Sequence, residues 1–483
     1  MTRILALLAC AWLLPAAAWA EVTVETDQLE LRFADNGDLL EARACLPRCA
    51  DPQAHARVLG GAPALLSFTS FATEPFDLER VDGETAIELR FEDSANGTYR
   101  RWRIPRGGWR LELAVDGASR LDLAGGDAFR PPESAGFGVW LEQPRYLVFD
   151  GSAVDVYPLD ETVEASSTAG WTGFRSRFWT AVLAPDRPVP VAFDGPEAAG
   201  SPALVLSPAP DGPLQLSLYL GPVEPAALRS ADPALGGMMY AALWFWLRWI
   251  CAALFWLLSM IHLVLPNWAL AIVALSVAVH FLMRPLTAIA DRLQDSVQRT
   301  EAKLAPELNE IRRNYRGEEQ AARVIALYKT HRVHPLYSLK SLAGVAVVIP
   351  VFIGAFDMLA ENIWLDGRTF LWIEDLSRPD HLLRLPFEIP FFGAWFNLLP
   401  FLMTGLSVLA SALHRHEAMD DASFGRHKRN LVLMALAFLL LFYTFPAGMV
   451  LYWTTNNLLS VIKYGWRNLR DGRSATTEHP DHE

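Results

Sequence analysis

The sequence predicts a multidomain membrane protein, in which an exported antiparallel β-sandwich precedes an α-helical bundle of five transmembrane helices with a cytoplasmic helical hairpin. Two patterns predict these parts: residues 21–235 alternate apolar and polar side chains, and long apolar stretches follow Gly236. The third observation is the charge of the first half. Residues 21–235 contain 33 acidic residues, 18 arginines and no lysine, which gives a net charge of −15. We do not expect so acidic a domain to bind nucleic acid.

The first 20 residues read as a secretory signal. Arg3 precedes a short apolar run, and Ala18-Trp19-Ala20 resembles a signal-peptidase site, so cleavage after Ala20 is predicted. An uncleaved N-terminal anchor is the alternative, and Cys10 lies in only a weak match to a lipoprotein box. In each case Arg3 stays inside and residue 21 onward is exported.

Residues 21–235 are expected to form many short strands, because period-two segments are separated by Gly, Pro, Asn and Asp. Cys45 and Cys49 then lie in an oxidising compartment, where a local disulfide is favoured over two free thiols. The chain contains no Gly-x-Ser-x-Gly, no His-Glu-x-x-His and no glycine-rich phosphate loop. We therefore predict a binding or spacing role for this domain, with no enzyme activity, metal or cofactor. The expected strands include 22–33, 85–91, 99–115, 145–149, 177–183 and 214–220.

The second half predicts five spans. The loop 286–340 has ten Lys and Arg against seven acids, and residues 414–429 and the C-terminal flank are also basic. The positive-inside rule places all three in the cytoplasm, which requires an odd number of spans after an exported domain. The expected spans are 267–285, 341–360, 391–413, 430–445 and 447–462.

The segment 236–265 is predicted to lie in the plane of the membrane. It holds four tryptophans, a residue type that is enriched at membrane interfaces, and its polar residues share one narrow helical stripe. A tilted sixth span is the alternative. The remaining divisions are a membrane domain over 266–470, in which a coiled-coil hairpin covers 288–338, and a short cytoplasmic tail over 471–483.

Polar residues within the apolar stretches are the candidate functional residues. His280 and Arg284 are four residues apart, which on a continuous helix places them on one face. A cation at membrane depth costs about 2.5–3.5 kcal/mol on insertion scales, so it usually faces protein or water. Thr404 and Asn456 could line the same polar interior. Arg284 snorkelling to the headgroups and a simple packing role for His280 are the alternatives.

Several segments resemble the YidC membrane-protein insertases of the Oxa/YidC/Alb superfamily. Residues 370–380 (Phe-Leu-Trp-Ile-Glu-Asp-Leu-Ser-Arg-Pro-Asp) resemble the exported loop of that family. Residues 445–453 (Phe-Pro-Ala-Gly-Met-Val-Leu-Tyr-Trp), with Pro446 and Gly448 in a tight turn, resemble its last helical hairpin. Tyr328-Lys329 and the Met283 to Thr287 segment are similar to the ends of its cytoplasmic hairpin and first core span.

The resemblance implies a five-helix core around a hydrophilic groove that opens to the cytoplasm and to lipid. A family arginine lies in that groove, but its position here holds His280, and Arg284 follows one turn later. Residues 336–349 also lack the usual Gly-Gly-Cys, and the tail 471–483 is not basic. The sequence is therefore predicted to be a divergent member of the family.

The function that this resemblance implies is insertion and folding of new membrane proteins in the bacterial inner membrane, through a groove containing His280, Arg284, Thr404 and Asn456. The implied partners are nascent membrane proteins and the lipid bilayer, with the Sec translocon and the ribosome as further candidates. Arg312, Arg313 and Lys329 of the hairpin are candidate docking residues. A solute transporter or channel, and a client-restricted membrane chaperone without general insertion activity, are the alternatives.

Overall fold

The structure is a computed structural model that divides into two compact units, residues 1–132 with 142–241 and residues 133–141 with 242–483. The predicted signal segment 1–20, including Cys10, lies outside the described residues, as does the end of the predicted tail. The structure describes residues 21–61, 63–70, 76–130, 136–149, 154–159, 163–194, 202–209, 212–331, 333–334, 339–413 and 421–477.

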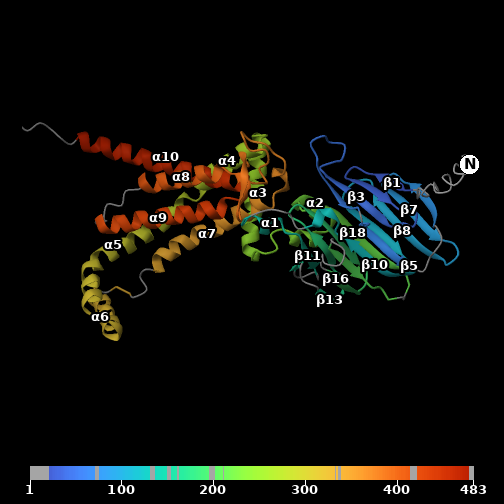
Figure 1. The fold of residues 1–483 in the computed structure, drawn as a ribbon, viewed down its shortest axis with the longest axis horizontal. Helices are drawn as coiled ribbons and strands as arrows, with labels where there is room; N and C mark the ends of the chain where they lie inside the picture. The colour runs from blue at the N-terminus through green and yellow to red at the C-terminus, as the bar shows by residue number, and fades with distance from the viewer. Residues whose placement is uncertain are drawn as a thin grey trace, which may run out of the picture. The chain divides into compact units, whose positions relative to one another are not determined.

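The first unit contains two antiparallel sheets of nine strands each, which matches the predicted β-rich domain (Figure 1). One sheet has the order β1-β2-β3-β5-β10-β17-β16-β13, with β4 paired to β3. Its strands are β1 (Val22–Glu25), β2 (Leu29–Phe33), β3 (Leu39–Leu46), β4 (His55–Gly60), β5 (Leu66–Ser70), β10 (Ala118–Ala124), β13 (Val163–Thr168), β16 (Val189–Asp194) and β17 (Ala203–Leu206).

The second sheet has the order β12-β11-β14-β15-β18-β9-β8-β7-β6. Its strands are β6 (Asp77–Asp82), β7 (Ala86–Asp93), β8 (Thr98–Pro105), β9 (Arg110–Val115), β11 (Arg145–Phe149), β12 (Val154–Pro158), β14 (Trp171–Arg175), β15 (Trp179–Pro185) and β18 (Leu214–Pro222). The helical pieces of the unit are η1 (Asp127–Phe129), α2 (Pro225–Ala231) and η2 (Pro233–Met238).

The alternating side chains of these strands build the core of the unit. In β2, Leu29, Leu31 and Phe33 are fully buried while the residues between them are partly exposed. Phe33 packs edge-on against Trp102 of β8, which belongs to the other sheet. The period-two pattern is therefore the physical basis of the sandwich.

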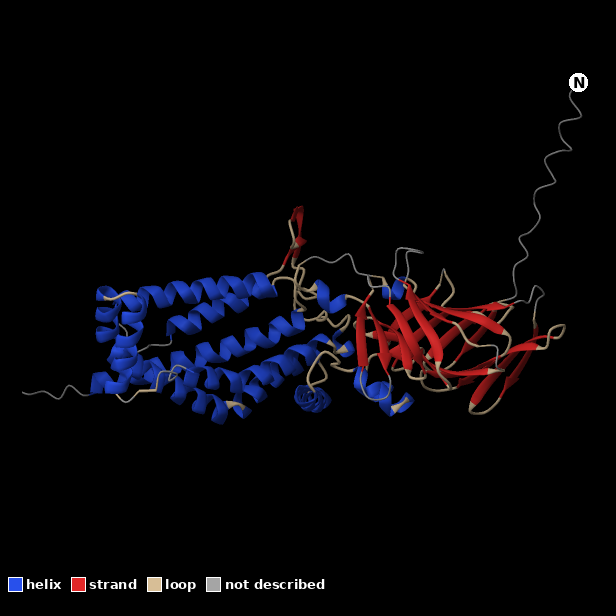
Figure 2. Ribbon diagram, turned by 90° about the horizontal axis from the view of Figure 1, so that it is seen from below, coloured by secondary structure: helices blue, strands red, loops and turns tan. Residues whose placement is uncertain are grey.

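The second unit is mainly helical (Figure 2). Its elements are α3 (Phe245–Val264), α4 (Trp268–Leu282), α5 (Arg284–Asn314), α6 (Gly317–Thr330), α7 (Leu339–Ala360), η3 (Ile363–Leu365), β19 (Leu383–Ile389), β20 (Gly393–Phe396), α8 (Leu399–Leu413), α9 (Asp421–Phe442) and α10 (Ala447–Thr477). Within this unit α10 packs against α4 and α8, and α7 packs against α3 and α5.

Helix α3 runs across the direction of α7, α8, α9 and α10 in Figure 1 and is seen end-on in Figure 2. It leaves tryptophans exposed along its length, among them Trp244, Trp249 and Trp256. By length and apolar composition alone, α3 is the one described helix that qualifies as a span by itself. A second candidate joins α4 to residues 284–290 across a 54° bend, and the other apolar helical segments are shorter.

One predicted span is wrong at its start. Residues 391–413 were expected to form a single helix, but α8 begins only at Leu399, and β20 occupies residues 393–396. The aromatic residues before Leu399 suit a strand as well as a helix, because Phe and Trp favour extended backbone. Apolar composition alone does not distinguish the two conformations.

A second difference concerns residues 136–141, which the sequence places inside the exported domain but which pack within the helical unit. This segment includes the start of α1 (Val139–Glu142). The backbone N–H of Gly138 donates to Oγ1 of Thr444 at 3.0 Å, and the ring of Trp140 stacks on Phe356 of α7. A side chain at Gly138 would collide with the carbonyl oxygen of Thr444, so glycine is required there.

Candidate functional site

Helices α4 and α10 run side by side in a parallel register. A Cβ atom at Gly448 would lie 3.1 Å from the carbonyl oxygen of Leu376 and 3.3 Å from Cδ1 of Ile272, so glycine fits where both the loop and α4 approach α10. One turn further on, the hydroxyl of Ser276 donates to the carbonyl oxygen of Tyr452 at 3.1 Å. By this register, His280 is expected at the level of Asn456, whose side-chain amide donates to the carbonyl oxygen of Tyr452 in its own helix at 3.1 Å.

A third predicted residue, Thr404, lies on α8, which also packs against α10. Asn457 donates its side-chain amide to the carbonyl oxygen of Met403 on α8 at 3.0 Å, which ties this level of α10 to α8. Thr404 follows Met403, and its buried hydroxyl has no hydrogen-bond partner among the described residues. His280, Asn456 and Thr404 therefore come from three helices that meet around one level of α10.

Arg284 is placed differently from the prediction. Helix α4 ends at Leu282 and α5 begins at Arg284 after a 54° bend, so His280 and Arg284 do not share one continuous helix face. Pro285, in the first turn of α5, suits a helix start because proline has no N–H to leave unsatisfied. The side chain of Arg284 is exposed.

The loop before β19 closes the opposite end of the helical unit. The carbonyl oxygens of Leu376 and Arg378 accept the backbone N–H groups of Gly448 and Ala447 at 2.8 and 2.7 Å. The first N–H groups of a helix have no partner within the helix, so this loop satisfies the start of α10. Pro446 and Gly448 therefore lie where the loop that contains Leu376 and Arg378 contacts the start of α10.

Asp380, in the same loop, joins three separate segments. Its Oδ2 atom accepts the indole N–H of Trp372 at 3.0 Å and the backbone N–H groups of Leu398 and Leu399 at 2.8 and 3.0 Å. The carboxylate, only 3% exposed, therefore caps the start of α8. Sequence reasoning assigned no role to Asp380, although it ends the motif at 370–380.

Asn397 and Tyr443 complete this closure. The side chain of Asn397 donates to the carbonyl oxygen of Tyr443 at 2.7 Å, and its Oδ1 accepts the backbone N–H of His381 at 3.0 Å. The Tyr443 hydroxyl donates to the carbonyl oxygen of Trp395 at 2.9 Å. These bonds connect the turn between α9 and α10 to the hairpin of β19 and β20.

The segment of the predicted helical hairpin contains α5 and α6. Leu304, Leu308 and Leu327 form its buried core, and Gly317 has a φ of +59° at the turn, a conformation that glycine adopts without strain. The candidate docking residues Arg312, Arg313 and Lys329 are all exposed. Of these, Arg312 lines a shallow pocket of about 490 Å³ at the turn.

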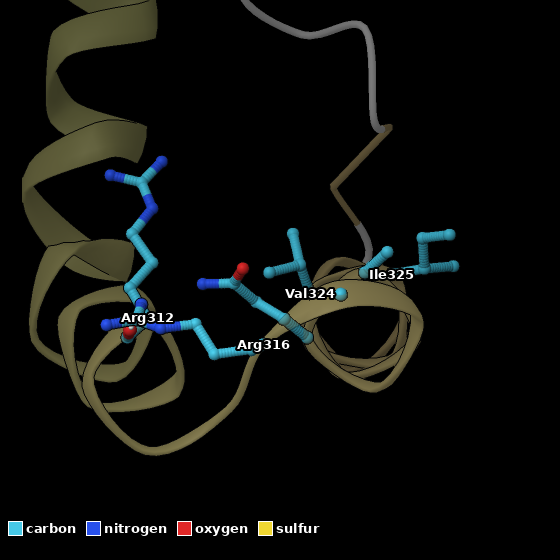
Figure 3. A pocket seen from close by; sticks show the side chains of 7 residues that line it. Arg312, Arg316, Val324 and Ile325 are labelled. Atoms are coloured by element: carbon cyan, nitrogen blue, oxygen red, sulfur yellow. Dashed lines mark hydrogen bonds between the residues drawn. The ribbon is translucent and has the colours of Figure 1, made fainter.

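Two chemically different walls form this pocket (Figure 3). Arg312 and Arg316 lie on the α5 side, whereas Val324 and Ile325 project from α6. Ile325 is 47% exposed, so the pocket offers apolar surface next to two positive charges. Such a surface suits a partner segment that carries both acidic and apolar side chains.

In the first unit, Cys45 and Cys49 form a disulfide, with Cα atoms 5.0 Å apart. The indole N–H of Trp109 donates to the carbonyl oxygen of Cys45, which ties the bridged turn to the start of β9. Among the residues that the structure describes, no group of three His, Cys, Asp or Glu side chains is arranged to hold a metal ion.

Comparison with known proteins finds a matching family model and several similar proteins. Residues 260–470 match the family model described as 60Kd inner membrane protein. The protein of Herminiimonas arsenicoxydans named "Membrane protein insertase YidC" is 26% identical over 368 residues, which cover 74% of this chain and 61% of that protein. The protein of the same name from Janthinobacterium sp. (strain Marseille) is 26% identical over 433 residues, which cover 84% and 73%.

A further relative of that name, from Syntrophobacter fumaroxidans, is 30% identical over 257 residues, covering 53% of this chain and 43% of its own. A solved structure titled "Active YidC insertase crystal structure with the first transmembrane domain resolved" covers 92% of both chains at 15% identity, with a TM-score of 0.35. The family match and the named relatives agree with the resemblance of the motifs at 370–380 and 445–453. The chain is therefore similar to the YidC membrane protein insertases, and its residues 260–470 match the family described as 60Kd inner membrane protein.

Proposed function

We propose that this protein inserts newly made membrane proteins into the bacterial inner membrane and assists their folding. The proposal is supported by the packing of α4 and α8 against α10, which carry His280, Thr404 and Asn456 at neighbouring turns of otherwise apolar helices. The buried hydroxyl of Thr404 has no hydrogen-bond partner among the described residues, and such a group is costly away from water, which favours a hydrated path here. The insertase names of the relatives support the same activity.

In the proposed mechanism, no covalent bond is made or broken. His280, Arg284 and the neighbouring hydroxyl and amide groups hydrate the polar flank of a client segment, which lowers the cost of moving it part-way across the membrane. The apolar part of the client then leaves sideways into lipid, and its burial supplies the driving free energy. The closure formed by Asp380 and the loop at 366–381 keeps the opposite end sealed.

The proposed topology follows the charge pattern. The signal over residues 1–20 exports the β-sandwich to the periplasm, α3 lies in the plane of the membrane, and α4, α7, α8, α9 and α10 span it. The exposed tryptophans of α3 and its direction across the other helices support this placement. The hairpin of α5 and α6 and the C-terminus then lie in the cytoplasm.

Proposed partners follow from the same placement. A client segment, the ribosome or the Sec translocon would contact the cytoplasmic hairpin, whose pocket combines arginines with apolar side chains. Arg312, Arg313 and Lys329 are the residues that we assign to this docking.

The test is complementation in cells depleted of their own insertase, with protease protection of a small Sec-independent client as the measurement. His280→Ala, Arg284→Ala and the double variant are compared with Arg292→Ala, a matched control that removes an exposed arginine two turns along α5. We expect the double variant to lose insertion, each single variant to retain part of it, and the control to behave as wild type.

Three outcomes would contradict the proposal in different ways. Full insertion by the double variant would exclude the two cations from the mechanism. A well-expressed, correctly oriented chain that restores no insertion would favour a client-restricted chaperone. Leakage of a small solute without client insertion would favour the transporter alternative, which would need a continuous polar path across the membrane.

A further inference from the structure

The short hairpin of β19 and β20 leaves large apolar side chains uncovered. Phe387 is 62% exposed, Phe391 54% and Leu383 48%. Arg384 and Glu388 are the only charged residues between Leu382 and Phe396. Such a surface in water is unfavourable, since each exposed apolar Å² costs about 25 cal/mol relative to its burial.

The pairing of the two strands is irregular along β19. Arg384 pairs with Trp395 and Ile389 pairs with Gly393, so residues 385–388 lie opposite Ala394 alone. Figure 2 shows these short strands standing away from the helices. A two-stranded hairpin by itself is marginally stable in water, so a further surface is expected to stabilise it.

The apolar surface of the hairpin continues into the outer side of α8. The ring of Phe396 stacks on Phe401 at a centroid distance of 5.3 Å, and Phe401 is itself 41% exposed on α8. Leu402 and Leu409 of α8 are also exposed. Because α8 is proposed to face lipid, this continuity indicates lipid as the surface that covers the hairpin.

We infer that the β19–β20 hairpin is an interfacial membrane anchor. Phe387 enters the acyl boundary of the outer leaflet, whereas Arg384 and Glu388 remain among the headgroups. Aromatic side chains favour this level of a bilayer, and the two opposite charges leave the hairpin neutral, so binding does not require anionic lipid. The inference rests on the proposed placement of the helical unit in the membrane.

The test uses the full-length protein in nanodiscs of phosphatidylethanolamine and phosphatidylglycerol, with Cys10 and Cys251 replaced by alanine. Phe387→Cys, Glu388→Cys and Leu409→Cys are labelled one at a time with an environment-sensitive nitrobenzoxadiazole dye. At Phe387→Cys we expect blue-shifted emission that loses more intensity to a shallow doxyl lipid than to a deep one. Aqueous iodide should quench the dye at Glu388→Cys, and the deep doxyl lipid should quench it at Leu409→Cys.

The Leu409 site separates the inference from the proposed function. Quenching by lipid at Leu409→Cys but only by iodide at Phe387→Cys would overturn the anchor and leave the membrane placement of α8 intact. Absence of lipid quenching at both sites would also contradict the placement itself. Equal lipid quenching at Phe387→Cys and Glu388→Cys would overturn the interfacial orientation.

Discussion

At the scale of single residues, the carboxylate of Asp380 holds together several segments at one end of the helical unit. The Oδ2 atom of Asp380 accepts three N–H groups, from the Trp372 indole and from the first residues at α8. These donors come from segments that are separated along the chain, so the loop, the hairpin and α8 share one anchor. Removal of the carboxylate would leave a buried indole N–H and a helix start unsatisfied.

Asp380→Ala is therefore expected to destabilise the helical unit. Loss of an N-cap costs about 0.5–2 kcal/mol, and an unsatisfied buried donor adds about 1–3 kcal/mol. The measurement is the thermal unfolding midpoint of the detergent-purified protein. Asp380→Asn is the matched control, because its amide oxygen keeps one acceptor, and it should lose less. An unchanged midpoint for Asp380→Ala would exclude this role.

Glu224 is expected to make the stability of the β-rich unit depend on pH. Its side chain accepts the backbone N–H groups of Ala226 and Ala227 at the start of α2, and burial raises its pKa above the ordinary value of 4.5. Because the folded pKa is raised, the folded protein binds this proton more readily than the unfolded chain. The contribution of Glu224 to stability therefore increases as the pH falls from neutral towards 4.5.

Glu224→Gln, which keeps an acceptor but cannot ionise, is expected to remove this dependence. The unfolding midpoint of the exported unit, followed in the full chain, should rise for wild type relative to the variant as the pH is lowered towards 4.5. Below that value the difference should stay constant. Parallel profiles across the whole range would show that Glu224 is not the group responsible.

At the scale of elements, the hairpin of α5 and α6 depends on a small core. Leu304 is 1% exposed and packs with Leu308 and Leu327, and partly buried residues such as Val324 surround them. Arg323 lies over the ring of Tyr315, 3.8 Å from its centroid, and adds a cation–π contact next to the turn. Since few residues hold α6 against α5, each of them contributes a large share of the packing.

Leu304→Ala is expected to loosen α6 from α5. Truncation of a buried leucine costs about 2–5 kcal/mol in folded cores, and 1.4 kcal/mol corresponds to about tenfold in an opening equilibrium. Amide hydrogen exchange over residues 317–330 of the full-length protein should therefore accelerate by about tenfold or more. Ile325→Ala, at a 47% exposed position of α6, is the control and should exchange at close to the wild-type rate. Equal rates in the two variants would contradict the assigned core.

The length of α8 is short for a helix that crosses a membrane. Helix α8 has 15 residues, about 22 Å at 1.5 Å per residue, against a hydrocarbon core of about 30 Å. If α8 spans, the membrane is thinned around it or its ends are covered by protein. The hairpin at its N-terminal end and the capping by Asp380 supply such a cover.

At the scale of the whole molecule, the topology is the central prediction. Single cysteines replace Glu79 in β6, Gln320 in α6 and Glu388 in β19, and each is challenged with a membrane-impermeant maleimide in sphaeroplasts. The five-span arrangement predicts labelling of the Glu79 and Glu388 positions in intact sphaeroplasts. The Gln320 position should react only after lysis, because the charge pattern places the hairpin in the cytoplasm.

In the alternative arrangement with six spans, α3 also crosses the membrane. If α3 were to span the membrane, the hairpin would lie on the same side as the exported unit, and the Glu79 and Gln320 positions would react together. Its length and apolar composition permit a span. Its direction across the neighbouring helices and its exposed tryptophans favour the in-plane position.

The local properties of this protein were determined by its sequence alone. Alternation of apolar side chains predicted the β-sandwich, the sequence predicted a coiled-coil hairpin over residues 288–338, and two motifs indicated the resemblance to a family. These features depend on neighbouring residues, so a linear pattern contains them. The pairing of Cys45 with Cys49 is of the same kind, since only three residues separate them.

Tertiary structure alone decided the features that depend on residues far apart in the chain. Three features belong to this class, because the local sequence does not indicate which distant residues take part. They are the helix break between His280 and Arg284, the capping of α8 by Asp380, and the packing of residues 136–141 on Thr444. The start of α8 at Leu399 rather than 391 belongs with them. An apolar aromatic segment can form a strand or a helix, and its contacts, here the Asn397–Tyr443 bonds and the Phe396–Phe401 stack, select one of the two.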